Sequence, residues 1–199
     1  MVVEYARSYD VVETVVDIHM KTFTGFFLTF LGKGFLKELY RGFIEHKYSN
    51  LIIAKDEESV IIGFLAYSED MSSLYKHLLK HGFFQFAFYA FLAFIKKPKI
   101  LFRLLSAFGK SEEVKREESY IELASIGVLP DKKSRGVGSE MITRLINNVD
   151  FSKFAYISLE TDAENNEYAN KFYQKNGFVL RRVYKTKEGR KMNEYRYKK

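Results

Sequence analysis

Apolar residues in the first half of the chain follow two different periods. Short β-branched runs bounded by turn residues are typical of strands, and apolar positions three or four residues apart are typical of helices. The predicted elements, in chain order, are a strand at 2–5, helices at 11–20 and 33–46, and strands at 51–55 and 60–67. The turn at 56–59 predicts that the last two strands form an antiparallel hairpin.

The two predicted helices each have one apolar face. Asp10, followed three residues later by Glu13, has the spacing of a capping box and predicts the start of the first helix. His19 lies on the inner face. We expect it either to pack in the core or to support residues of the functional site without touching the ligand itself. The inward residues are Val12, Val15, Val16 and His19 of the first helix, and Leu36, Leu39, Tyr40 and Phe43 of the second.

The second half of the chain alternates strands and helices regularly. Strand-like runs at 119–128, 156–161, 178–184 and 192–197 are interleaved with helical patterns at 136–148 and 166–176. Gly177 directly follows the second of these helices, where glycine often takes the left-handed conformation that ends a helix. The order of elements predicts an α/β fold with one mixed sheet and helices on its faces.

The segment 71–110 interrupts this order, because it has no strand pattern and almost no turn residues. It predicts two or three inserted helices, broken near Gly82 and Pro98. Residues 83–95 are apolar on every side, so this helix must be buried, pair with a second protomer or contact lipid. We rank burial first, a homodimer second and membrane contact third, since the run is shorter than the ~20 residues of a bilayer span.

Composition excludes several classes of protein. The 199 residues predict a single domain over 1–199, and the absence of cysteine excludes disulfides and cysteine nucleophiles. The histidines lack metal-ligand spacing, so we expect no metal. Residues 1–10 lack the apolar core of a signal peptide, so we expect a cytoplasmic protein. The net charge of +7 suits a phosphate-bearing ligand, and without a recognition motif we expect no nucleic-acid partner.

A glycine-containing turn joins a predicted strand to the helix at 136–148. Gly136 and Gly138 let backbone N–H groups approach a ligand, and the helix start adds unpaired donors. This arrangement predicts a pyrophosphate site. A dinucleotide-binding fingerprint would need a third glycine where Met141 stands, and a P-loop would need a lysine where Ser139 stands. Both of those families are therefore disfavoured.

A second motif lies on the helix at 166–176. Asn166 is a suitable N-cap residue. Ala169, Phe172 and Tyr173 share one face, because residues three or four apart are neighbours on a helix. A tyrosine on such a face is ordinarily a core residue, so this pattern alone assigns Tyr173 no chemical role.

The two motifs, in this order and spacing, resemble the acetyl-CoA motifs of the GNAT superfamily of N-acetyltransferases. The family pattern Gln/Arg-x-x-Gly-x-Gly/Ala corresponds to Lys133-Ser134-Arg135-Gly136-Val137-Gly138, with lysine in the first position. The pattern Asn-x-x-Ala-x-x-Phe-Tyr, with its Asn-Gly-Phe ending, matches residues 166–178. The resemblance covers 119–184 strongly. It implies the GNAT fold, a mixed and mostly antiparallel sheet with splayed central strands flanked by helices, here with the helical insertion at 71–110.

The resemblance also implies acetyl-CoA as the acyl donor and assigns roles to individual residues. Tyr173 would protonate the departing thiolate, and Glu122 would be the general base, with Glu160 on the neighbouring strand as its alternative. The backbone N–H of Val128 would support the developing oxyanion. The residues implied to bind the cofactor are Ile126, Val128, Lys133, Ser134, Arg135, Gly136, Val137, Gly138, Asn166 and Tyr173.

The acceptor site of this family is usually built by the first two helices and their loop, which would place Phe23, Phe26, Phe27 and Glu160 around the acceptor. We therefore predict acetyl transfer from acetyl-CoA to a primary amine of a small molecule, with an amino sugar as the candidate. Two alternatives stay open: an acyl-CoA-binding module with a regulatory or interaction role, and an acetyltransferase of protein or peptide amines. These phenylalanines would form an aromatic wall of the acceptor site, which weighs against a small, highly charged acceptor such as a polyamine.

Overall fold

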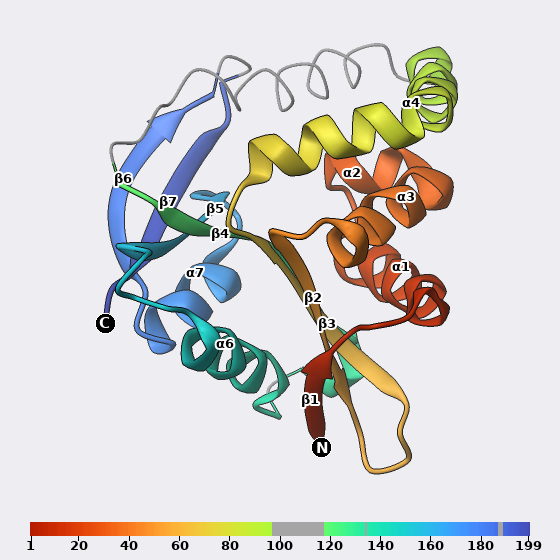
Figure 1. Ribbon diagram of the computed structural model, residues 1–199. Helices are drawn as coiled ribbons and strands as arrows, with labels where there is room; N and C mark the ends of the chain where they lie inside the picture. The colour runs from red at the N-terminus through yellow and green to blue at the C-terminus, as the bar shows by residue number, and fades with distance from the viewer. Residues whose placement is uncertain (97–117, 134, 187–188) are drawn as a thin grey trace.

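In the described residues, seven strands form one sheet at the centre of the molecule (Figure 1). The computed structural model describes residues 1–96, 118–133, 135–186 and 189–199, without the side chains of residues 27, 82–86 and 89–96. Paired strands are antiparallel, except that β4 and β5 are parallel. In spatial order the strands are β1 (Val2–Tyr5), β2 (Ser49–Lys55), β3 (Ile61–Ser68), β4 (Tyr120–Val128), β5 (Tyr156–Asp162), β7 (Lys191–Tyr197) and β6 (Val179–Lys185).

Helices cover both faces of this sheet (Figure 1). On one face lie α1 (Val12–Thr22), α2 (Phe27–Phe30), α3 (Gly32–Glu45) and α4 (Met71–Lys96). On the other lie α6 (Val137–Asn148) and α7 (Glu167–Lys175). Two short 3-10 turns, Tyr9–Val11 and Pro130–Lys132, stand before α1 and α6.

Each face of the sheet has its own hydrophobic core, because neighbouring residues of a strand point to opposite faces. Along β2, Leu51 and Ile53 belong to the core with α1 and α3, whereas Ile52 and Ala54 belong to the core with α6 and α7. Full burial of an aliphatic side chain of this size contributes roughly 1.5–3 kcal/mol. Every inward position predicted for the first two long helices is buried, including His19. The alternation along the strands therefore decides which helix covers which face.

The two parallel strands in the middle of the sheet separate after a short paired stretch. Pairing joins only Tyr120–Glu122 to Tyr156–Ser158, although β4 continues to Val128 and β5 to Asp162. On its other edge β4 stays paired with β3, and the register shifts there by one residue, leaving Ala124 as the extra residue of a β-bulge. The predicted splaying of the central strands is confirmed. Among the described residues, no strand pairs with the β5-facing edge of β4 over its second half.

Most of the predicted elements are confirmed, but three details are wrong. Asp10 does not cap α1, because it lies inside the turn Tyr9–Val11, where a helical backbone excludes the extended conformation of an N-cap. α4 runs through Gly82 without a break, since one glycine costs a helix only about 1 kcal/mol relative to alanine. The Phe-rich stretch before α3, predicted as a loop, contains the short helix α2.

The insertion is helical where the structure describes it. The first half of α4 packs on α3, and Leu74 and Leu78 are buried in the shared core. Farther along, Phe88 is 57% exposed, so burial within the chain is not found at this residue. Pro98, with the rest of 97–110, lies outside the described residues. A homodimer or lipid contact through 83–95 stays a prediction. No helix in the described part of the chain combines the length and apolar character needed to cross a membrane.

Candidate functional site

The glycine turn before α6 has the geometry of an anion site. Gly136 has φ +83°, in the left-handed region that favours glycine, and a Cβ added there would meet no described neighbour within 4 Å. α6 begins at Val137, and within the described residues no side chain caps the N–H groups of its first turn, which have no partner inside the helix. Such donors at a helix start attract phosphate. The turn is therefore open at the predicted position, although Ser134 lies outside the described residues.

The second glycine of the turn brings the two motifs into contact. A Cβ on Gly138 would lie 2.9 Å from the ring of Phe172, so this glycine lets the first turn of α6 pack closely against α7. Lys133 lies 5.9 Å from the ring centre of Tyr168, which is also on α7. The side chains of Lys133 and Arg135 are exposed beside the turn. Positive charge, open backbone and the start of α7 thus meet at one place.

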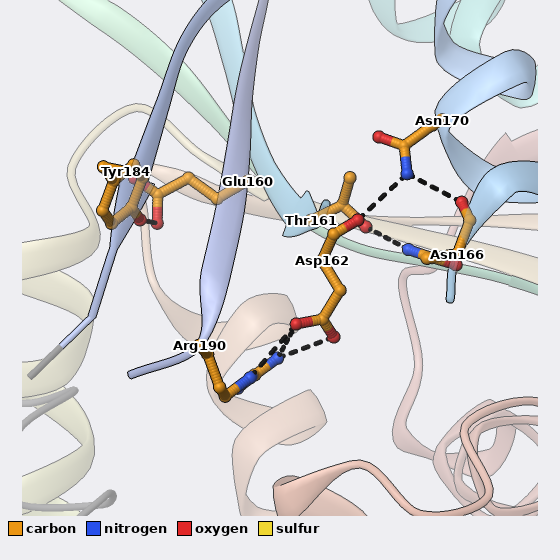
Figure 2. A network of polar contacts seen from close by, with 7 residues as sticks. All are labelled: Glu160, Thr161, Asp162, Asn166, Asn170, Tyr184 and Arg190. Carbon is orange, nitrogen blue, oxygen red and sulfur yellow. Dashed lines mark hydrogen bonds and ion pairs between the residues drawn. The ribbon is translucent and has the colours of Figure 1, made fainter. Parts of the chain in front are cut away.

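Two asparagines tie α7 to the end of β5 (Figure 2). Asn166 Nδ2 donates to Thr161 Oγ1 at 2.7 Å, and Asn170 Nδ2 donates to the carbonyl oxygen of Asp162 at 3.0 Å. Asn166 occupies the predicted N-cap position of α7, but its side chain makes no capping hydrogen bond. The amide bonds to Thr161 instead. These contacts fix where α7 begins, and hence where the residues farther along the helix lie.

Tyr173 lies on the inner side of α7 with its hydroxyl protonated. Its side chain is 9% exposed, and burial raises the pKa of the hydroxyl, which therefore keeps its proton at neutral pH. The ring packs against Phe172, Phe178 and Tyr195. No hydrogen bond joins the hydroxyl to another residue of the described ranges. A protonated hydroxyl without an internal partner can donate to a ligand.

Ile126 and Val128 lie on the part of β4 that has left β5. Both side chains are partly buried on the face covered by α6 and α7. From the opposite face, Thr22 Oγ1 of α1 donates to the carbonyl oxygen of Val128 at 3.1 Å. The absent side chain of Gly127 also makes room for the ring of Phe23. The end of α1 thus approaches β4 at the residues implied to bind the cofactor.

Two glutamates flank the point where β4 and β5 separate. Glu122 is the last residue of β4 that pairs with β5, and Glu160 lies just beyond the last residue of β5 that pairs with β4. Both point to the face of α1, α3 and α4, because their chain neighbours Ile121 and Leu159 belong to the opposite core. Burial, and then the charges of these glutamates, raise the pKa of Tyr75 on α4. The three groups are therefore close together.

Glu160 has partners of its own. The hydroxyl of Tyr184 on β6 donates to it, and a nitrogen of Arg182 lies 3.9 Å from its other oxygen (Figure 2 shows the tyrosine contact). The fully buried Glu194, which pairs with Glu160 across the strands, binds Arg182 and Arg196. Sequence reasoning missed Tyr184 and Arg182. The only signal is the alternation of basic and aromatic residues in the last strands.

The phenylalanines predicted for the acceptor site gather at the end of α1. The rings of Phe23 and Phe26 are 5.5 Å apart between centres, and Phe26 is 40% exposed. Phe23 also packs on His19, at 4.7 Å between ring centres. The side chain of Phe27 lies outside the described residues. Within the described ranges no contact joins these rings to Glu160, which approaches the same face from β5.

The sequence matches a family model described as the acetyltransferase (GNAT) family over residues 12–178. The chain belongs to this family. It is therefore an acetyl-CoA-dependent N-acetyltransferase, and acetyl-CoA is its acyl donor. The residues at the turn fit such a donor, because the open backbone at Gly136 and the exposed charges of Lys133 and Arg135 are what a pyrophosphate requires. In the part of the chain that the structure describes, no three histidine, aspartate or glutamate side chains gather to hold a metal ion.

Solved structures show the same GNAT fold. One is a protein from Desulfovibrio desulfuricans assigned to the GNAT family, with TM-score 0.64 and 15% identity, covering 99% of this chain and 98% of that one. A second, from Bacillus anthracis, is assigned as a streptothricin acetyltransferase and was solved with acetyl coenzyme A, with TM-score 0.52 and 18% identity, covering 80% and 68%. A third is a chimera of the spermidine N-acetyltransferase from Vibrio cholerae and hSSAT, with TM-score 0.60 and 12% identity, covering 100% and 96%. A comparison with curated proteins finds no match.

Proposed function

We propose that this GNAT acetyltransferase acetylates a primary amine of a small molecule, and that the two substrates meet where β4 and β5 separate. The separation of these two strands is the main observation that supports the proposal. It frees one edge of β4, and the freed residues Ile126 and Val128 lie on the same side of the sheet as the open turn at Gly136 and the protonated hydroxyl of Tyr173. Glu122 points to the opposite side, from which an acceptor would approach.

The chain's own groups would hold the donor, which supplies the acetyl group as a thioester. The N–H groups of the first turn of α6 would bind the pyrophosphate, with Lys133 and Arg135 beside them. Backbone groups of Ile126 and Val128 would pair with the amide-bearing arm of the donor. Asn166, oriented by Thr161 and next to the partly exposed end of β5, would contact the same arm.

Three groups would manage charge and protons during the transfer. Glu122 would take a proton from the amine, directly or through water, so that the nitrogen can attack the thioester carbonyl carbon. The N–H of Val128 would stabilise negative charge on the carbonyl oxygen. As the carbon–sulfur bond breaks, Tyr173 would give its proton to sulfur and regain one from solvent. Glu160, whose carboxylate accepts a hydrogen bond from Tyr184, would be the alternative base.

The acceptor would carry an apolar or carbohydrate face beside its amine. Phe26, partly exposed at the end of α1, offers a ring on which the C–H face of a sugar can pack. An amino sugar therefore suits this wall better than a small polycation does. A polyamine is nevertheless the acceptor named for one protein of the same fold, so the experiment must separate the two.

Release of free thiol from acetyl-CoA, followed against a panel of amines, tests the proposal. The panel is glucosamine, spermidine and a short peptide with a free amino terminus, at equal concentrations. We expect the highest kcat/KM with glucosamine, and a product acetylated on nitrogen by mass spectrometry. Faster reaction with spermidine or the peptide would contradict the acceptor assignment alone. Binding of acetyl-CoA without turnover on any amine would contradict the proposed function.

A further inference from the structure

The peptide unit that joins Val128 to Leu129 is held from two sides. Thr22, the last residue of α1, donates its hydroxyl hydrogen to the carbonyl oxygen of Val128 at 3.1 Å. The N–H of Leu129 donates to the carbonyl oxygen of Ile62 on β3 at 2.9 Å. Both directions are certain, because a carbonyl oxygen can only accept. None of the roles above uses the hydroxyl of Thr22, which links α1 to the end of β4.

The bond from Leu129 shows which edge of β4 the backbone groups of Val128 face. The peptide bond between the two residues is trans, so its C=O points opposite to its N–H and hence away from β3. The N–H groups of successive strand residues alternate between the two edges of the strand, so the N–H of Val128 also points away from β3. Both groups therefore face the edge from which β5 has separated.

The N–H of Val128 needs such a restraint because a glycine precedes it. A Cβ on Gly127 would lie 2.8 Å from the ring of Phe64, so close packing requires glycine at this position. Glycine restrains the backbone less than any other residue. The peptide unit that carries the N–H of Val128 thus has a permissive residue on one side and the peptide unit held by Thr22 on the other. Only the φ and ψ angles of Val128 separate its N–H from that held unit.

We propose that Thr22 is a positioning residue that keeps the N–H of Val128 directed at the carbonyl oxygen of the acetyl group. The inference rests on the proposed function, since it needs this oxygen to lie beside Val128. In this role Thr22 exchanges no proton and touches neither substrate, because its one hydrogen is bonded to the carbonyl oxygen of Val128. Phe23 directly follows Thr22 and packs on Phe26. The helix end that carries these two rings is thereby tied to the strand that would bind the donor.

Binding of acetyl-CoA and of CoA tests the inference without turnover. CoA has the same nucleotide and the same arm but ends in a thiol, so only acetyl-CoA offers a carbonyl oxygen to the N–H of Val128. Thr22→Val replaces the hydroxyl by a methyl group of similar size. It should weaken acetyl-CoA binding about threefold to tenfold, as expected for one impaired hydrogen bond, and weaken CoA binding less than about twofold. Calorimetric titration with each ligand measures the two Kd values.

Two further variants separate this role from a contribution to stability. Thr22→Ser keeps the hydroxyl and should bind both ligands as the parent does. Thr29→Val is the matched control, because the hydroxyl of Thr29 donates to the carbonyl oxygen of Phe23 at 2.6 Å, at the same end of α1 but not to β4. It should lose similar stability in thermal denaturation and leave the ratio of the two Kd values unchanged. Where Thr22→Val does not fold, Thr22→Ala takes its place, since alanine favours a helix.

Steady-state kinetics with the best amine of the panel give a second readout. Thr22→Val should lower kcat about fivefold and leave the KM of the amine unchanged, a smaller loss than the roughly 10²–10³-fold for removal of an oxyanion donor. Equal losses of affinity for acetyl-CoA and CoA would make Thr22 a merely structural residue and overturn the inference. Unchanged affinity for both ligands would also overturn it. The ratio of Kd values needs no amine, so it decides the role of Thr22 even if the parent acetylates no amine, which would contradict the proposed function.

Discussion

At the scale of single residues, burial sets the protonation state of the proposed acid. The raised pKa of Tyr173 means that the hydroxyl is protonated across the neutral range and loses its proton only at strongly alkaline pH. The proposed acid, which must donate one proton in each turnover, is thus already protonated at neutral pH. The pH dependence of the reaction near neutrality should therefore come from the amine and the base, not from Tyr173.

Tyr173→Phe should fold normally and bind acetyl-CoA nearly as well as the parent, because the ring stays to pack. Its kcat should fall by roughly 10²–10⁴-fold if proton donation to the thiolate occurs in the transition state. Steady-state kinetics with the best amine of the panel measures this. The matched control is Tyr195→Phe, whose ring centre is 6.0 Å from that of Tyr173 and whose hydroxyl donates to Asn170 at 3.0 Å. It should cost about 1 kcal/mol of stability and little kcat. A kcat for Tyr173→Phe within twofold of the parent would make Tyr173 a packing residue.

Residues tied to a local motif could be predicted from the sequence, and residues placed by tertiary contact could not. Gly136 precedes a helix in a recognisable spacing, and its left-handed backbone agrees with that reading. Thr22 and Tyr75 carry no such signal. The hydroxyl of Thr22 reaches Val128 only because the end of α1 lies beside β4, and Tyr75 meets the glutamates only because α4 folds back over the sheet.

At the scale of elements, the turn before α6 is proposed to contribute more to pyrophosphate binding than the rest of the helix does. The proposed pyrophosphate site needs a backbone that points N–H groups outward. That backbone takes a conformation which residues other than glycine adopt at a cost of about 1–2 kcal/mol. The same cost applies to any positive-φ glycine of the chain. Comparison of two such glycines therefore separates the strain from the loss of binding.

Gly136→Val should weaken acetyl-CoA binding at least tenfold, because it distorts the turn and places a branched side chain in the open space beside it. Gly32→Val is the matched control. Gly32 has φ +86° against +83° for Gly136, and an added Cβ meets no described atom at either position. Thermal denaturation should show similar losses of stability, whereas calorimetric titration should show weakened binding only for Gly136→Val. Equal affinities in the two variants would place the pyrophosphate elsewhere.

The elements themselves were largely predictable, and the errors at Asp10 and α2 share one cause. The limits of α3 and β4 follow from apolar spacing, but Asp10 was misassigned because one more turn of helix precedes α1. α2 is too short for its period to appear in the sequence. Local rules locate long periodic elements, and they fail at ends and single turns, where tertiary packing decides the backbone.

At the scale of the whole molecule, the net charge of +7 raises the question of whether the donor responds to the total field or to the charges beside the turn. Charges farther apart than a Debye length, about 10 Å at 0.1 M salt, are largely screened. Lys133 and Arg135 are exposed at the turn, whereas Lys76 and Lys80 are exposed on α4, against the opposite face of the sheet. Replacing either pair removes the same charge.

The variant Lys133→Gln with Arg135→Gln should weaken acetyl-CoA binding several-fold at low salt and flatten the dependence of Kd on sodium chloride. The variant Lys76→Gln with Lys80→Gln should keep both the Kd and the salt dependence of the parent. Titrations at three salt concentrations provide the measurement. If both pairs change the Kd equally, the overall field attracts the donor and the two residues at the turn have no special role.

The bulge at Ala124 has a consequence for how this site can vary. A bulged strand bends and twists more than its partner, and the extra residue stands just beyond the last pair between β4 and β5. Removing Ala124 would join Leu123 directly to Ser125, and every remaining side chain of β4 would keep both its face and its partner on β3. The bend is thus encoded in the length of the strand and not in the identity of any residue. A substitution at Ala124 should therefore keep the extra residue and the bulge, whereas a deletion of one residue there should restore regular pairing with β3.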